Sequence, residues 1–457
     1  MWIAKPFAAV GLVCLVACGG GASTDGFNTS IPFSVGGTVT GLKGTGLVLQ
    51  DNGGDDTAIS SNGAFSFPTM APSGSAYTIT VSTEPTNPKQ TCTLTGGTGV
   101  VGGADVTSVL VTCTTDASRF AFVVNTGSNT VSTYAIDLGT GVLSPTVGSP
   151  FTVGTSPQDI VITPSGKHAY VSSHIGTAGM VAAYAVDAQT GALSELAITP
   201  AAIAGLPNQA SDPAGKFLYV GGENSVYGYT IDDSTGALTS IAGSPFSGTP
   251  APAGVAALRV HPSGNFLYVA NTGGHNVLGY SINASSGALT QLSGSPFTIV
   301  ANPAPTVQPV AIAFDPTGNF AYVIADSTIY SYSVDPGTGA LTAIAGSSSG
   351  AAGTFPRAIA VNATGTTAYV ADASSGQLSA YSIGPTGALT FVNGSTVNTG
   401  QLPINLIVHP SGFVYTANWA SGDVSAFNSA ASGGAATPIV GSPFAAGTNP
   451  NVIVLGD

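Results

Sequence analysis

The stretch Phe266-Leu267-Tyr268-Val269-Ala270-Asn271 decides the fold, because the chain returns to it again and again. Counterparts begin at six other positions, with 46 to 54 residues between successive starts: Phe120, His168, Phe217, Phe320, Thr367 and Phe413. Each copy is an apolar run rich in aromatic and β-branched residues, which is typical of a buried strand. Self-similarity at such a period indicates an architecture in which every copy belongs to one structural unit.

Further strand-like segments follow each copy. The segment Val226-Tyr227-Gly228-Tyr229-Thr230-Ile231 leads into a Thr-Gly turn and the short strand Ala237-Leu238-Thr239. Many units close on Gly-Ser-Pro-Phe, and the next strand comes before a Pro-Ser-Gly or Pro-Thr-Gly turn. Four strands in a unit of about 50 residues predict the blade of a β-propeller. Leucine-rich repeats are shorter, and helical repeats need a 3.6-residue period that the chain lacks.

The two ends of the repeat region predict how the propeller closes. In units two to seven an inner strand precedes the Tyr-Val strand, whereas the first unit has none. After the seventh unit the chain ends in the spare strand Pro450-Asn451-Val452-Ile453-Val454-Leu455. We expect this strand to pair into the first blade, which completes seven blades over residues 116–457 and removes the open edge.

Residues 31–115 show a different pattern, with alternating segments such as Val106-Thr107-Ser108-Val109-Leu110-Val111. Period-two alternation with Gly, Asn and Ser between the segments predicts a small Ig-like β-sandwich. The fold class is therefore all-β. Cys92 and Cys113 lie in this region, and in an oxidising compartment we expect them to form a disulfide. Two buried free thiols are the alternative.

The N-terminus predicts export. Residues 1–18 combine Lys5 with an apolar stretch too short to span a bilayer, and they end in Leu15-Val16-Ala17-Cys18, which resembles the bacterial lipobox. Residues 19–30 are expected to form a flexible tether. We therefore expect a lipid anchor on Cys18 that holds the protein in the cell envelope, at the outer membrane or the periplasmic face. Ordinary secretion with cleavage nearby is the alternative.

The low content of charged residues limits which classes of molecule can bind the protein. Only 6% of the residues are charged, the net charge is −13, and no Lys/Arg cluster occurs, so nucleic acid and anionic lipid surfaces are poor partners. No His/Cys cluster has zinc spacing, and we expect neither a metal nor another cofactor. The partners we expect are a small molecule or a protein or glycan of the envelope, bound by a monomer.

The repeat resembles the lactonase-type seven-bladed propellers, which include bacterial 6-phosphogluconolactonases and carboxymuconate cyclases. It also resembles the Tyr-Val-Thr-Asn (YVTN) repeats of prokaryotic surface proteins. Tyr268-Val269-Ala270-Asn271 and residues 187–193 carry the likeness, which covers nearly all of 116–457. Enzymatic members act on anionic substrates with Arg, His and Glu around the channel mouth, and they are usually cytoplasmic. This chain departs from them in its export signal.

In a propeller, the channel mouth on one face is built from the starts of the inner strands and the loops after the Tyr-Val strands. On this face we expect three catalytic candidates, His174, Glu223 and Arg357. An imidazole and a carboxylate can transfer protons, and an arginine can hold an anion. The same scheme places further ligand-binding side chains on the rim: Gln158, Asp159, Asn208, His275, Asp326, Asp372, Asn405 and Asn451. Alternatively, these side chains are solvated or cap strand ends.

Three functions fit the sequence. The first is an envelope module that binds a ligand or a protein. The second is a hydrolase that opens a sugar-type lactone, with Glu223 or His174 as base and Arg357 stabilising negative charge. The third is a structural surface protein that leaves the rim unused.

Overall fold

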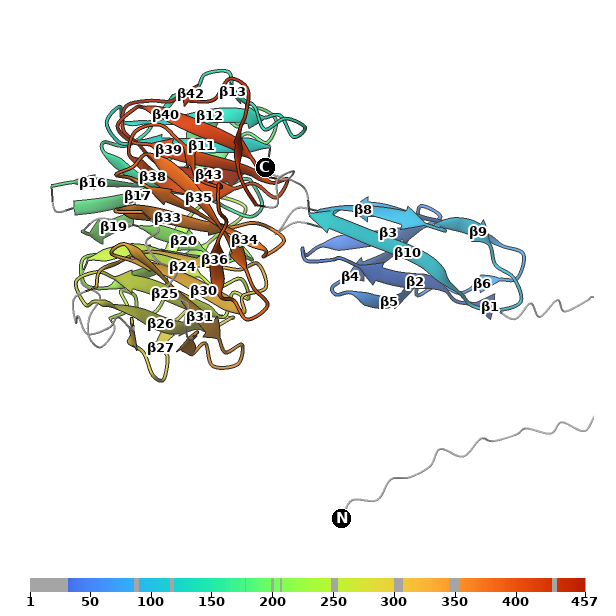
Figure 1. The fold of residues 1–457 in the computed structure, drawn as a ribbon. Helices are drawn as coiled ribbons and strands as arrows, with labels where there is room; N and C mark the ends of the chain where they lie inside the picture. Colours follow the sequence, from blue (N-terminus) through green and yellow to red (C-terminus); the bar gives the residue numbers. More distant parts are fainter. Residues whose placement is uncertain are drawn as a thin grey trace, which may run out of the picture.

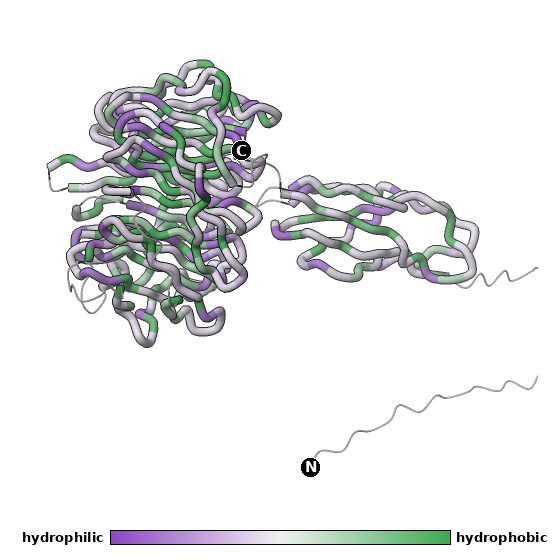
Figure 2. The backbone as a smooth tube through the Cα atoms, viewed as in Figure 1, coloured by the Kyte–Doolittle hydropathy of each residue, from purple (hydrophilic) through white to green (hydrophobic). Residues whose placement is uncertain are grey.

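The computed structural model describes residues 32–85, 90–115, 119–176, 178–198, 201–205, 208–247, 254–299, 307–344, 353–429 and 434–456. Within these ranges the chain forms strands and turns, and no helix there is long and apolar enough to cross a membrane. The expected signal peptide, the lipidated Cys18 and the tether lie outside the described residues. Figure 2 shows that hydrophobic residues are spread over the strands and are not gathered in one segment.

The first ten strands build two four-stranded sheets and one two-stranded sheet over one core (Figure 1). One sheet has the order β5 (Gly63–Ser66), β2 (Val35–Thr40), β10 (Val106–Thr115) and β8 (Gln90–Thr95). The other has the order β4 (Asp55–Ile59), β3 (Leu47–Asp51), β7 (Ala76–Thr83) and β9 (Thr98–Val100), and β1 (Pro32–Phe33) pairs with β6 (Ala71–Pro72). Alternate residues such as Leu47 and Leu49 are fully buried, which explains the period-two pattern.

A disulfide joins the strands β8 and β10. Cys92 and Cys113 are directly opposite each other in the antiparallel ladder, and the structure links them by an S–S bond. Both side chains are buried in the core between the two sheets.

Replacing both cysteines by alanine (C92A/C113A) is expected to destabilise the sandwich by about 3 kcal/mol, because the unfolded chain gains the freedom of the opened loop. The propeller contains no cysteine, so its transition should not move. Calorimetry of the wild type with and without reductant, beside the double variant, checks this. Quantitative alkylation of both thiols in the unreduced protein would contradict it.

The remaining strands form seven antiparallel sheets, each with four strands in order from the channel outward. Blade 1 contains β43 (Pro450–Gly456), β11 (Phe120–Asn125), β12 (Thr130–Ile136) and β13 (Leu143–Pro145). Blade 2 contains β15 (Pro157–Ile162), β16 (His168–Ile175), β17 (Ala178–Val186) and β18 (Leu193–Glu195). Blade 3 contains β20 (Gln209–Ser211), β21 (Phe217–Gly221), β22 (Val226–Ile231) and β23 (Leu238–Ser240). Blade 4 contains β24 (Val255–Val260), β25 (Phe266–Asn271), β26 (Asn276–Ile282) and β27 (Leu289–Gln291).

The last three blades have the same order. Blade 5 contains β29 (Pro309–Phe314), β30 (Phe320–Ala325), β31 (Thr328–Val334) and β32 (Leu341–Ala343). Blade 6 contains β33 (Pro356–Val361), β34 (Thr367–Asp372), β35 (Gln377–Ile383) and β36 (Leu389–Phe391). Blade 7 contains β38 (Pro403–Val408), β39 (Phe413–Asn418), β40 (Asp423–Asn428) and β41 (Thr437–Pro438). In five blades a short extra strand also pairs with the third strand: β14 (Phe151–Thr152), β19 (Ala201–Ala204), β28 (Phe297–Thr298), β37 (Val397–Asn398) and β42 (Phe444–Ala445).

The inner strands form a closed ring. Each of β43, β15, β20, β24, β29, β33 and β38 contacts the next, and β38 returns to β43. The last strand pairs with the first strand of the propeller, from Phe120 opposite Gly456 to Asn125 opposite Pro450. The closure expected from the two ends of the repeat region is therefore confirmed.

Buried tyrosines connect the blades. The tyrosine of the Tyr-Val strand donates its hydroxyl to a glycine carbonyl in the next blade, as in Tyr268 Oη to Gly339 O at 2.6 Å. Gly339 has φ +70°, and a Cβ there would come within 2.7 Å of the Phe266 ring. Both conditions favour glycine, which explains the Thr-Gly turn of the repeat. The same bond occurs in three further blades: Tyr170 to Gly236, Tyr219 to Gly287 and Tyr415 to Gly141.

Strand registers define two faces of the propeller. The starts of the inner strands lie opposite the ends of the second strands, as in Pro157 opposite Ser173, and we name this side the mouth face. The opposite side carries the Pro-Ser-Gly turns and the start of β11, and we name it the turn face. Only residues 116–118 separate β10 from the described start of the propeller. The sandwich is thus attached on the turn face, and the mouth face points away from it (Figure 1).

Candidate functional site: the mouth face

The three catalytic candidates lie on the mouth face but come from different blades. His174 is half-buried near the end of β16 in blade 2, and its backbone N–H donates to Ser156 O at 3.1 Å. Glu223 is exposed in the turn after β21 in blade 3. Arg357 is the second residue of β33 in blade 6, across the ring. No hydrogen bond or ion pair joins two of these side chains within the part of the chain that the structure describes.

Arg357 presents an exposed positive charge near the start of the inner strand β33. It occupies a bulge, because its neighbours Pro356 and Ala358 pair with Asp372 and Ala371 and leave Arg357 without a partner residue in the ladder. Its guanidinium lies 4.9 Å from the centre of the Phe355 ring, whose side chain is 50% exposed. Partial desolvation lowers the pKa of Arg357, but arginine stays charged at neutral pH. The stacked cation can hold a carboxylate through its free N–H groups.

Four of the expected rim residues connect neighbouring inner strands. Each side chain forms a hydrogen bond with the backbone of the next blade in the ring. Two of them accept: Asn405 Oδ1 accepts from Ile453 N at 3.1 Å, and Asp159 Oδ2 accepts from Gln209 N at 2.8 Å. The other two donate: Asn451 Nδ2 donates to Gln158 O at 2.6 Å, and Asn208 Nδ2 donates to Val255 O at 2.9 Å. These bonds run in sequence from blade 7 through blades 1, 2 and 3 to blade 4. They satisfy backbone N–H and C=O groups of the neighbouring inner strands.

The other rim residues hold the loops in place. Gln158 Nε2 donates to Ser156 O at 3.1 Å, and His275 Nδ1 lies 3.3 Å from Val307 O. Asp326 Oδ1 accepts from Gln308 N at 3.2 Å. Burial opposes the ionisation of Asp372, yet the backbone N–H groups of Ser375 and Phe355 outweigh it and lower the pKa of this carboxyl. No group of three or more His, Cys, Asp and Glu is arranged to hold a metal ion in the described ranges.

Asp159 and Arg259 bring opposite charges to the channel. Burial raises the pKa of Asp159 to about 6. The hydrogen bond from the backbone N–H of Gln209 and the positive charge of Arg259 favour the ionised form, but they only partly offset this effect. Arg259 is the fifth of the six residues of the inner strand β24, its side chain is exposed, and its Nη1 donates to Leu258 O at 2.9 Å. The sequence left the direction of this side chain open.

The substitution Asp159→Asn (D159N) is expected to change how stability depends on pH. Because the folded-state pKa of about 6 exceeds the ordinary value of 3.8, the folded protein keeps this proton when the unfolded chain has lost it. The wild type then loses about 2.4 kcal/mol of stability as the pH rises from 4 to 7. An asparagine does not titrate, so D159N lacks this loss. Urea unfolding at pH 4 and at pH 7 should therefore show that the free energy of unfolding of D159N, relative to that of the wild type, is higher at pH 7 than at pH 4 by that amount. An unchanged difference between the two proteins would contradict the raised pKa.

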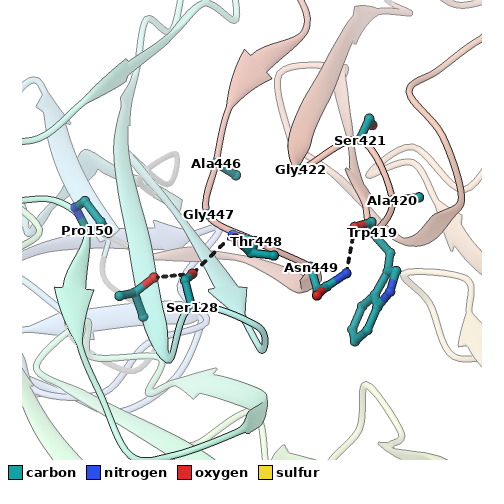
Figure 3. Close-up of a pocket in the computed structure, with 11 residues that line it drawn as sticks. Ser128, Pro150, Trp419, Ala420, Ser421, Gly422, Ala446, Gly447, Thr448 and Asn449 are labelled. Carbon is teal, nitrogen blue, oxygen red and sulfur yellow. Dashed lines mark hydrogen bonds between the residues drawn. The ribbon is translucent and has the colours of Figure 1, made fainter.

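A surface pocket of about 440 Å³ lies between blades 7 and 1 on the same face (Figure 3). The loop from Trp419 to Gly422 forms one side, and Ser128 lies on the other. The segment that leads into β43 runs between them, where Asn449 Nδ2 donates to Trp419 O at 3.3 Å and Thr448 N donates to Ser128 Oγ at 3.2 Å. Every residue that lines the pocket is uncharged.

Trp419 was not among the site residues expected from the sequence, although an alignment of the repeats shows that blade 7 departs from the other blades at this position. After the last Asn of the Tyr-Val strand, blades 1 and 4 have Thr126 and Thr272. The hydroxyls of these threonines donate to Pro157 O at 2.7 Å and to Pro309 O at 2.8 Å, in the inner strand of the next blade. Blade 7 has Trp419 at this position. A residue that connects blades is thus replaced by an aromatic side chain that lines a pocket.

Comparison with known proteins gives a family and a set of similar structures. The family model described as lactonase, seven-bladed β-propeller, matches three overlapping segments, residues 75–309, 212–350 and 324–450. A 6-phosphogluconolactonase-like protein from Bacteroides fragilis has a TM-score of 0.62 at 20% identity, covering 75% of this chain and 99% of its own. The periplasmic gluconolactonase of Pseudomonas aeruginosa has a TM-score of 0.60 at 19% identity, covering 74% of this chain and 99% of its own. No curated protein matches the chain. At such identities the likeness shows a common fold, because function depends on the site residues.

Proposed function

Because the chain belongs to the lactonase family of seven-bladed β-propellers, we propose that it is a ligand-binding propeller of the cell envelope. The mouth face binds a small, weakly anionic, ring-shaped ligand such as a sugar acid. Cys18 carries the lipid anchor and residues 19–30 form the tether. Because the sandwich is attached on the turn face, the protein presents its mouth face away from the anchor.

The position of the cations carries this proposal. The propeller contains five Lys or Arg residues, and three of them lie on the turn face: Arg119, Lys167 and Lys216. Lys167 is paired there with Asp233 at 2.6 Å. Arg357 is the one at the start of its inner strand, on the mouth face, whereas Arg259 is the fifth of the six residues of β24 and lies toward the turn-face end of the channel. In a chain of net charge −13, the arginine of the mouth face attracts a carboxylate, whereas a phosphate would favour a denser cluster of cations.

Isothermal titration with gluconate and glucuronate tests the binding, with glucose as the neutral comparison. Arg357→Ala (R357A) is expected to weaken sugar-acid binding at least tenfold, because it removes a charge-assisted contact, and the control K216A changes a cation on the turn face and should have no effect. A wild type that binds no sugar acid overturns the proposal and favours the structural surface role.

Lactone hydrolysis is the second candidate function, favoured by the fold that the chain shares with the periplasmic gluconolactonase. Glu223 is exposed on the mouth face, and its carboxylate can take a proton from water as the water attacks the ring carbonyl. Arg357 then stabilises the oxyanion, the ring C–O bond breaks, and the leaving alkoxide receives a proton to give the hydroxy acid. His174 is the alternative base.

A panel of sugar lactones distinguishes these possibilities. If Glu223 or His174 is the base, E223Q or H174A should abolish hydrolysis while the melting curve stays nearly unchanged. A wild type that opens no lactone in the panel rejects the hydrolase and leaves the binding function to be decided by titration.

A further inference from the structure

We propose a second binding site, in which a neutral saccharide lies in the pocket between blades 7 and 1 and stacks on Trp419. The site is separate from the sugar-acid site at Arg357, and it does not depend on the lactonase-like function.

The chemistry of the lining points to a sugar. Trp419 is half-buried and its ring borders the pocket beside Asn449 (Figure 3). A pyranose ring has an apolar face of C–H groups that packs on an aromatic ring, and hydroxyls around its edge that need donors and acceptors. Side chains with hydroxyl and amide groups also line the pocket and can serve those hydroxyls: Ser128, Thr130, Ser421, Thr448 and Asn449. A volume of about 440 Å³ is within the usual range of small-molecule sites.

The charge of the site favours a neutral ligand. The pocket is lined by uncharged residues, in contrast to the arginines of the channel. The nearby carboxylate of Asp423 accepts a hydrogen bond from Asn418 Nδ2 at 2.6 Å. No cation of the lining could offset the desolvation of an anionic ligand.

The fold does not require tryptophan at this position. Thr126 and Thr272 show that a threonine serves the same loop in blades 1 and 4 and adds a bond to the next blade. The backbone contacts of blade 7 are made without the indole: Trp419 N donates to Leu402 O at 3.0 Å, and Trp419 O accepts from Asn449. The substitution Trp419→Thr (W419T) should therefore remove the ligand platform and leave the fold intact.

The test uses the full chain with the substitution W2F, which leaves Trp419 as the only tryptophan. Titration with cellobiose, maltose and N,N′-diacetylchitobiose is expected to shift the Trp419 emission in a saturable way for at least one of them. Saturation-transfer NMR or calorimetry then compares variants. W419T should weaken binding at least tenfold with an unchanged or higher melting temperature, and W419F should keep binding within about fivefold.

Two more variants define the site. Asn449 has φ +54°, which glycine accepts, so N449G removes the amide without straining the loop and should weaken binding severalfold. Phe391 is 42% exposed on the outer strand β36, and F391A, as the matched aromatic control, should bind like the wild type. The proposal is overturned if no saccharide shifts the emission, if W419T binds as well as the wild type, or if glucuronate competes at this site as strongly as the neutral sugars.

Discussion

Deletion of Pro450–Gly456 (β43) is expected to leave a propeller that does not fold to a stable monomer at 25 °C. The deletion exposes the edge of β11, with which β43 pairs along its whole length, and it opens the ring between β15 and β38. Ile453 alone is 99% buried, and such a side chain contributes roughly 1.5–3 kcal/mol. With the lost ladder bonds at about 1 kcal/mol each, the sum reaches the roughly 5–15 kcal/mol of a typical net stability.

Circular dichroism, chemical unfolding and light scattering of the truncated protein check this expectation. Two single substitutions provide a matched pair. Ile453→Asp buries a charge in the closing strand and should be strongly destabilising, whereas Val440→Asp changes a side chain that is 89% exposed and should have little effect. A truncated protein that stays monomeric with the wild-type melting temperature would show that the closure does not stabilise the ring.

Tyr268→Ala (Y268A) is expected to lower the free energy of unfolding by about 3–5 kcal/mol. The side chain is fully buried between blades 4 and 5, and its ring contacts Phe297 and Phe314. The milder Y268F removes only the hydroxyl and should cost about 1–3 kcal/mol, because the carbonyl of Gly339 loses its donor inside the protein. Chemical unfolding of the three proteins at one pH measures both steps.

Tyr322 is the matched control for Y268F. It is the equivalent tyrosine in blade 5 and is equally buried, but among the described residues its hydroxyl has no hydrogen-bond partner. Y322F removes an unsatisfied polar atom and should be neutral or stabilising. If Y268F and Y322F cost the same, the tyrosine hydroxyls do not contribute to the contact between blades.

Local patterns of the sequence were enough to predict the fold. Each strand can be recognised from its own run of apolar, aromatic and β-branched residues. The recurrence of segments like Tyr268-Val269-Ala270-Asn271 at a regular period indicated that the chain consists of repeated structural units packed side by side. Counting inner strands then assigned 450–455 to blade 1, because an open blade edge is costly and only one spare strand was available. Position on the mouth face also followed from the sequence, since the antiparallel order of the strands places His174, Glu223 and Arg357 on the same side.

Only the tertiary structure decided what the mouth-face side chains contact. Asn405, Asn451 and Asp159 bond to backbone atoms about 50 residues away in sequence, or almost 300 in the case of Asn451. Such contacts depend on the offset between neighbouring blades, and a period-two pattern carries no information about that offset. The same holds for the burial that raises the pKa of Asp159, for the direction of Arg259 and for the pocket at Trp419. A repeat sequence specifies each blade locally, whereas the chemistry of the mouth arises where different blades meet.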